Sequence, residues 1–165
     1  MNNHDKNTYV RKQLTHALLH LLQTKKLEEI SVSELTQQAQ VGRASFYRNY
    51  KSLSDILFQY DKLLIYQWSI KFERDPSSNF FNVFGSLFQH YKDHADFYLL
   101  LYKNGLTKTI LETILDHFDI NDKLENQDAY TKSFWAYGIY GWVMEWMKRG
   151  MVEGFDGINA MFANQ

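Results

Sequence analysis

Apolar residues recur at helical spacing along most of the chain, and no segment alternates apolar and polar residues as a β-strand would. The first apolar stripe predicts an amphipathic helix over residues 8–24, because the other side of that helix would be polar. The stripe consists of Val10, Leu14, Ala17, Leu18, Leu21 and Leu22. The chain has 165 residues, of which 45% are hydrophobic, so it can bury a core. This pattern predicts an all-α protein of one or two small domains.

Capping and turn residues divide the rest of the chain into further helices. Ser31 and Glu34 have the spacing of a capping box, and Gly42 can stand at the start of a second short helix. Asp75–Pro76 favours a new helix start, and that helix would carry Phe80, Phe81, Phe84, Leu87, Phe88 and Tyr91. The other expected elements are helices over 32–39, 43–50, 53–74, 129–150 and 156–163, a helix stop at Asn104–Gly105, and a helix from the cap Thr107 to about residue 118.

Composition excludes several classes of protein. Because the chain has no cysteine, a disulfide scaffold, a cysteine-ligated zinc site and a thiol nucleophile are ruled out. The first residues contain no long apolar run, so we expect no signal peptide. The longest strongly apolar run, residues 134–144, is too short to span a bilayer. We therefore expect a soluble, cytoplasmic protein with no membrane partner.

Charge is distributed unevenly, although the net charge is only −1. Residues 1–52 hold eight Lys and Arg against four Asp and Glu, a net charge of +4, whereas residues 53–165 hold ten against fifteen, a net charge of −5. A basic front part and an acidic rear part predict different partners for the two parts.

Residues 30–51 contain the most informative pattern, two short capped helices separated by a tight turn. Their apolar residues fall where such a pair must pack together: Val32, Leu35, Ala39, Val41 and Phe46. The second helix then exposes Arg43, Ala44, Ser45, Tyr47 and Arg48. Arginine can pair with guanine or phosphate, hydroxyl groups reach phosphate oxygens, and a small residue lets the helix enter a groove. The alternative is an ordinary helical hairpin with solvated charges.

This segment resembles the N-terminal DNA-binding domain of the TetR/AcrR family of transcriptional regulators. The resemblance covers Thr8, Arg11, Ile30–Val32, Glu34–Leu35, Ala39, Val41, Phe46–Arg48 and Tyr50–Leu53. Two positions depart from the family pattern, because Gln40 replaces the usual turn glycine and Gly42 replaces the usual capping serine. Residues 137–151 more weakly resemble the penultimate helix of the shorter family members.

The resemblance implies a helix-turn-helix DNA-binding domain over residues 1–52 and a helical ligand-binding and dimerisation domain over residues 53–165. It implies a homodimer that binds palindromic double-stranded operator DNA, most often as a repressor that a small molecule releases. The alternative is an activator or co-regulator of the same fold that is controlled by binding of a partner protein. The implied DNA contacts are Thr8, Ser31, Ser33, Arg43, Ala44, Ser45, Tyr47, Arg48, Tyr50 and Lys51.

The rear part of the chain is rich in aromatic residues, since 23 of the 27 lie beyond residue 53. Such residues serve as core filler, and they also form the walls of ligand pockets. We expect a small hydrophobic effector between the rear helices, lined by Tyr60, Leu64, Trp68, Phe84, Phe88, Tyr91, Tyr98, Tyr102, Phe134 and Tyr137.

The expected helix over 129–150 is apolar nearly all round its middle, so it needs cover on several sides. The helix could be covered within one subunit or by a subunit interface. Its two glycines, Gly138 and Gly141, favour the interface, because they allow another helix to approach closely. The expected interface residues are Trp135, Gly138, Gly141, Trp142, Trp146 and Met147.

Two histidine pairs, His16/His20 and His90/His94, have a spacing that can bind a metal on one helix face. The first pair lies on a polar stripe and the second spans an expected helix junction, so we expect no metal site. No phosphate-binding loop or nucleophile motif is present. We therefore expect no enzyme activity and no cofactor.

Overall fold

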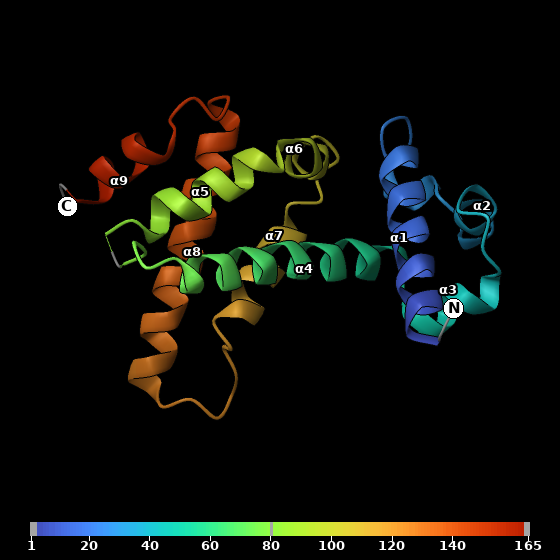
Figure 1. Ribbon diagram of the computed structural model, residues 1–165, viewed down its shortest axis with the longest axis horizontal. Helices are drawn as coiled ribbons and strands as arrows, with labels where there is room; N and C mark the ends of the chain where they lie inside the picture. Colours follow the sequence, from blue (N-terminus) through green and yellow to red (C-terminus); the bar gives the residue numbers. More distant parts are fainter. Residues whose placement is uncertain (1–2, 80, 164–165) are drawn as a thin grey trace.

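The computed structural model describes residues 3–79 and 81–163, which form helices joined by turns and loops, with no β-strand among these residues (Figure 1). This arrangement confirms the all-α class that the helical spacing predicts. The elements are α1 (Asn3–Leu21), the 3₁₀ turn η1 (Leu27–Glu29), α2 (Val32–Gln38), α3 (Arg43–Asn49), α4 (Leu53–Arg74), α5 (Val83–Asp93), α6 (Ala95–Lys103), α7 (Lys108–His117), α8 (Asn126–Lys148) and α9 (Phe155–Ala163).

Helices α1, α2 and α3 pack together into a unit that we call the head. Its centre is made by apolar side chains that the chain brings together from all three helices. Leu14, Leu18, Leu35 and Phe46 are completely buried there, and Ala39 is nearly so. A small residue at position 39 lets α3 cross close to the end of α2. The packing that the sequence predicts for residues 30–51 is therefore present.

The turn between α2 and α3 closes through backbone hydrogen bonds. The N–H of Val41 donates to the Thr36 carbonyl and the N–H of Gln40 donates to the Gln37 carbonyl, the pattern of a Schellman motif. In this motif the residue directly after the helix cap adopts the left-handed conformation, and Gln40, which holds that position, has a φ of 55°. Glycine is the usual residue at such a position, so Gln40 holds a backbone conformation that side chains disfavour.

Helix α4 connects the head to the remaining helices, which we call the body (α5–α9). The Ser52 hydroxyl accepts a hydrogen bond from the Asp55 N–H and so caps α4. Near this end, Arg11 on α1 donates to the Gln59 side chain at 3.3 Å. Figure 1 shows α4 crossing α1 and then running through the body beside α5 and α7. One continuous helix therefore belongs to both parts.

The body packs around aromatic side chains from three helices, α5, α6 and α8. Phe88 makes edge-to-face contacts with Trp142 and Trp146, and Tyr91 packs against Tyr98 with ring centroids 4.5 Å apart. Helix α9 lies closely on α5, because a Cβ at Gly85 would come within 2.6 Å of the Phe155 carbonyl oxygen. None of the described helices combines the length and the apolar character that a membrane crossing requires.

The helix expected from Asp75–Pro76 does not form there, and this prediction is wrong. The Asp75 carboxylate accepts hydrogen bonds from both the N–H and the hydroxyl of Ser77, so it holds a polar turn instead. Helix α5 begins only at Val83, and Phe81 lies exposed before it. Phe80 lies outside the described residues.

Several helix ends also differ from the predictions. Helix α1 ends at Leu21 rather than 24, and α8 begins at Asn126, three residues early. Glu34 does not complete a capping box, since its carboxylate pairs with Lys25 instead, although the Ser31 hydroxyl caps α2. Thr107 stands at the start of α7, but its hydroxyl accepts a hydrogen bond from Tyr140 rather than capping the helix.

Candidate nucleic-acid interface and ligand cavity

The outer face of α3 carries the side chains that the sequence places there. Arg43, Ala44, Tyr47 and Arg48 are exposed, and 60% of the Tyr47 side chain is accessible to solvent. Phe46, between them, anchors the opposite face of α3 in the head core and contacts the Tyr47 ring edge-to-face at 5.1 Å. The arrangement presents two guanidinium groups and a phenol together on one short helix.

Most of the other expected DNA-contact residues also lie on the surface of the head. Thr8, Ser31, Ser33 and Lys51 are exposed, whereas Ser45 is half-buried and its hydroxyl accepts a 3.0 Å hydrogen bond from Arg48.

Tyr50 is the exception, since only 4% of it is accessible. It stands after the end of α3 in extended conformation, so its ring turns inward. There it lies against Phe46 and under the guanidinium of Arg11. Tyr50 is therefore a core residue of the head, which corrects its expected role in DNA contact.

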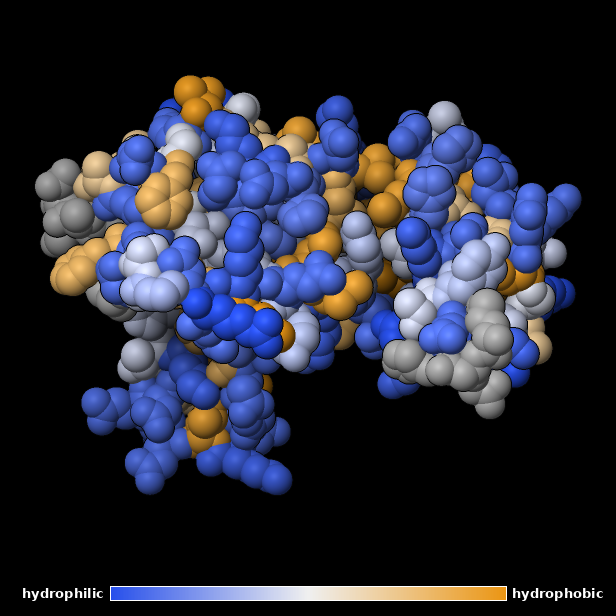
Figure 2. Space-filling view, in the orientation of Figure 1, coloured by the Kyte–Doolittle hydropathy of each residue, from blue (hydrophilic) through white to orange (hydrophobic). Residues whose placement is uncertain are grey.

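The head and the body touch at a second point besides α4. At the end of α6, the Asn104 side chain donates a 3.2 Å hydrogen bond to the carbonyl of Leu22, just past the end of α1. The same amide donates to the Leu100 carbonyl at 2.9 Å, which fixes its direction. Figure 2 shows hydrophobic atoms in the hollow between head and body, and mainly hydrophilic atoms on the outer side of the head.

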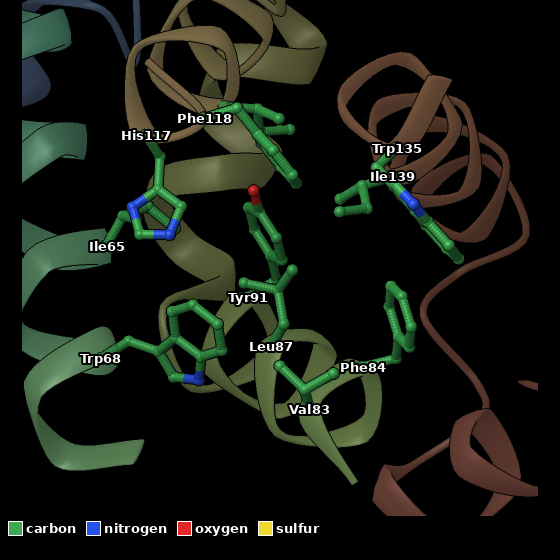
Figure 3. Close-up of a pocket in the computed structure, with 11 residues that line it drawn as sticks. Ile65, Trp68, Val83, Phe84, Leu87, Tyr91, His117, Phe118, Trp135 and Ile139 are labelled. Atoms are coloured by element: carbon green, nitrogen blue, oxygen red, sulfur yellow. The ribbon is translucent and has the colours of Figure 1, made fainter. Parts of the chain in front are cut away.

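A cavity of about 280 Å³ lies in the body between α4, α5, α7 and α8 (Figure 3). Its walls are almost entirely apolar or aromatic, and none of its lining residues is Asp, Glu, Lys or Arg. The Phe84 and Trp135 rings stack on one side at 5.8 Å, and Trp68 lies on the α4 side. The lining residues are Ile65, Trp68, Val83, Phe84, Leu87, Tyr91, Ile114, His117, Phe118, Trp135 and Ile139.

Three of the ten residues expected to line a pocket do line this cavity: Trp68, Phe84 and Tyr91. Phe88 and Tyr98 are buried in the core away from it, whereas Tyr102, Phe134 and Tyr137 face outward. Leu64 and Tyr60 line two other, more polar hollows on the surface. The aliphatic lining residues were missed, although Ile65 stands three residues before Trp68 on the same face of α4.

A buried polar chain runs beside the cavity and connects three helices. The Tyr98 hydroxyl on α6 donates to Oδ1 of Asp61 on α4 at 2.8 Å, and Nε2 of His90 on α5 lies 3.1 Å from the same hydroxyl. Because the tyrosine proton is used toward Asp61, His90 donates to the tyrosine oxygen. Oδ2 of Asp61 has no hydrogen-bond partner among the described residues.

Burial controls the ionisation of this chain. Desolvation raises the pKa of Asp61 to about 6, although the hydrogen bond from Tyr98 opposes the rise. Desolvation also lowers the pKa of His90 to about 4, with a smaller contribution from the nearby His94. Asp61 is a functional candidate that the motifs in the sequence do not indicate. A carboxylate between Leu57 and Ile65 on the apolar stripe of α4 was the available signal.

The outer side of α8 is an exposed stripe of aromatic residues and glycines. Phe134 is 73% accessible and Tyr137 54%, and the residues that share the stripe are Tyr130, Gly138 and Gly141. Of the expected interface residues, Trp146 and Met147 are buried within the chain, so they cannot serve as exposed anchors. Trp135 lines the cavity and Trp142 is partly buried against Phe88.

The histidine pairs do not form a metal-binding group within the described part of the chain, where no three His, Asp or Glu side chains come together. His90 is bonded to Tyr98, and His94 stands at the junction where α5 ends and α6 begins, as the sequence predicts.

No protein-family model matches the sequence, and no curated protein does. The fold is similar to that of the crystal structure of Lin0861 from Listeria innocua, with a TM-score of 0.78 over 99% of this chain and 92% of that chain. The two sequences are 15% identical, so the likeness shows a common fold alone.

Proposed function

We propose that the chain is a DNA-binding transcriptional regulator of the TetR type. The observation that carries the proposal is the exposed face of α3, which presents Arg43, Tyr47 and Arg48 on a three-helix head whose residues have a net charge of +4. Arginines on such a helix can read guanine in the major groove, while surrounding hydroxyl and lysine groups bind phosphates. No catalytic activity forms part of the proposal.

Two copies of the chain would bind the two halves of a palindromic operator, since twofold protein symmetry requires twofold symmetry in the DNA. The stripe on α8 supports such a homodimer. A Cβ at Gly138 or Gly141 would meet no atom of the described residues within 4 Å, so packing inside the chain does not require glycine at either position. Each glycine costs a helix about 1 kcal/mol, and close approach of a second α8 would explain both.

The cavity provides the regulatory part of the proposal. It is lined by Ile65 and Trp68 of α4, the same helix that begins at the head. A small hydrophobic molecule in the cavity would contact α4 directly and favour the position of the head that this contact requires. We propose that such an effector releases the DNA.

Selection from a random duplex library tests the proposal. The wild-type chain should retain a palindromic site in a salt-sensitive manner, because phosphate contacts release counterions. Arg43→Ala and Tyr47→Ala should each lower affinity, by about tenfold for a lost guanine contact. Arg74→Ala, at the far end of α4, is the matched control and should leave affinity unchanged. Unaltered affinity in folded Arg43→Ala and Tyr47→Ala variants would contradict the proposed interface.

A further inference from the structure

The chemistry of the cavity between α4, α5, α7 and α8 limits what can bind there. None of its eleven lining residues is Asp, Glu, Lys or Arg, so a cation would lose its hydration without gaining a carboxylate in the wall, and an anion would find only the imidazole of His117. The nearest buried carboxyl group, Asp61, lies one helical turn before Ile65, and its hydrogen bond goes to Tyr98. When ionised it would also repel an anion. An uncharged ligand fits this environment.

The volume of the cavity indicates the size of the ligand. At about 280 Å³ it is nearly twice the size of an engineered cavity of roughly 150 Å³ that holds one benzene ring. Its walls are flat in several places, because the Phe84 and Trp135 rings stack together on one side and the Trp68 indole forms another side. Aromatic faces pack well against a flat ring system. The space therefore suits two fused aromatic rings.

Tyr91 is the hydrogen-bonding group deepest in this apolar space. Only 1% of the residue is accessible to solvent, and its ring stands in the middle of the lining residues with the hydroxyl directed toward Phe118 and His117 (Figure 3). Among the described residues this hydroxyl has no hydrogen-bond partner, and it keeps some surface open to the cavity. Burial, and to a smaller degree Asp61, raises the pKa of Tyr91 well above 10, so the phenol keeps its proton and can donate it.

We propose that this cavity binds an uncharged molecule of two fused aromatic rings carrying one hydrogen-bonding group, and that the Tyr91 hydroxyl binds that group. The proposal rests on the proposed function only in taking this cavity as the effector site. A ligand that fills the cavity displaces water from this hydroxyl, so a ligand that hydrogen-bonds to it gains over one that leaves it without a partner. The ligand class is thus defined by shape, by lack of charge and by one polar atom.

Calorimetric titration of the full chain, in the absence of DNA, tests the proposal with four matched probes. They are 2-naphthol, its apolar isostere 2-methylnaphthalene, the anion 2-naphthoate and the cation 2-naphthylmethylammonium. The wild-type chain should bind one 2-naphthol per subunit, about three- to tenfold more tightly than 2-methylnaphthalene, as one neutral hydrogen bond predicts. Both charged probes should bind at least about tenfold more weakly than 2-naphthol.

Tyr91→Phe removes the hydroxyl and keeps the ring, so the fold should survive. In this variant 2-naphthol should bind about three- to tenfold more weakly, while the affinity for 2-methylnaphthalene should stay the same. Tyr102→Phe, whose hydroxyl belongs to an exposed residue outside the cavity, is the control and should bind like the wild type.

Three results would overturn the proposal: no binding of 2-naphthol, equal affinities of wild type and Tyr91→Phe for it, or tighter binding of either charged probe. Each is distinct from a failure of the proposed function, which the duplex selection measures without any probe. If 2-naphthol binds but no duplex is retained, the cavity assignment stands and the regulator assignment falls. If both bind, added 2-naphthol should reduce duplex retention, less so in Tyr91→Phe.

Discussion

The Tyr98 hydroxyl donates a 2.8 Å hydrogen bond to Asp61, and this contact joins α6 to α4 inside the core of the body. The carboxylate is 1% accessible, and its second oxygen has no partner in the described residues. Such a group is costly when charged. A buried carboxylate beside the cavity therefore makes the stability of the body depend on pH.

We predict that Asp61→Asn changes this dependence. The pKa of Asp61 is raised from 3.8 in the unfolded chain to about 6 in the folded one. The carboxyl group therefore contributes most to stability below pH 4, and this contribution, about 3 kcal/mol, is lost as pH rises through 6. Urea unfolding followed by circular dichroism should show that the variant gains on the wild type by about that amount between pH 4 and 7. A constant difference would contradict the burial effect.

His90→Gln should have the opposite effect. Burial lowers the pKa of His90 from 6.5 to about 4, so its contribution to stability is complete above pH 6.5 and is lost as pH falls through 4. The loss, about 3 kcal/mol, should disappear in the variant, which keeps an amide donor for Tyr98. The two groups oppose each other between pH 4 and 6, so the wild type should vary less with pH there than either variant. His16→Gln, on the exposed side of α1, serves as the control.

Asn104→Ala should weaken the contact between head and body. The variant loses the hydrogen bond to the Leu22 carbonyl, which is worth about 1 kcal/mol. Hydrogen exchange should speed up at the end of α1 and at the start of the following turn, with little change inside α8. Asn121→Ala removes an asparagine whose hydrogen bonds are local to the loop before α8, so exchange in the head should not respond. Equal responses to the two substitutions would show that Asn104 does not hold the head.

Phe134→Glu should dissociate the proposed homodimer. A carboxylate in the middle of the exposed α8 stripe would be buried against a second copy without a partner, which is strongly unfavourable. Sedimentation equilibrium should show a dimer for the wild type and a shift toward monomer for the variant. Phe81→Glu, at a comparably exposed phenylalanine outside that stripe, should remain a dimer. A monomeric wild type at working concentration would remove the basis of the dimer.

The helical class and the head core could be predicted because they depend on periodicity and local capping. Leu14, Leu35 and Phe46 are buried where the spacing places them, and Ser31 and Ser52 cap the helices that follow them. The false helix start at Asp75–Pro76 has a local cause as well, since an aspartate that can cap a helix can equally hold a turn with Ser77.

The cavity could be predicted only in part, because periodicity tells which face of a helix is inward but not what it meets. Phe88 and Trp68 both lie on inward faces, yet Phe88 packs against Trp146 while Trp68 lines the open space. The difference depends on how α5 and α8 are placed relative to each other, which is a long-range property. The outward direction expected for Tyr50 fails for a related reason. Tyr50 lies one residue past the end of α3, where the backbone becomes extended and the side chain no longer follows the helical spacing.

Helix α4 runs without a break from Leu53 to Arg74, a length of about 33 Å at 1.5 Å per residue. Its Ser52 end is fixed beside the head, and Trp68 stands toward the other end in the wall of the cavity. A stiff rod of this kind magnifies small rotations, since a tilt of about 5° displaces its far end by about 3 Å. In the homodimer that we propose, a shift of one side chain near Trp68 would therefore change the spacing of the two heads by several ångströms.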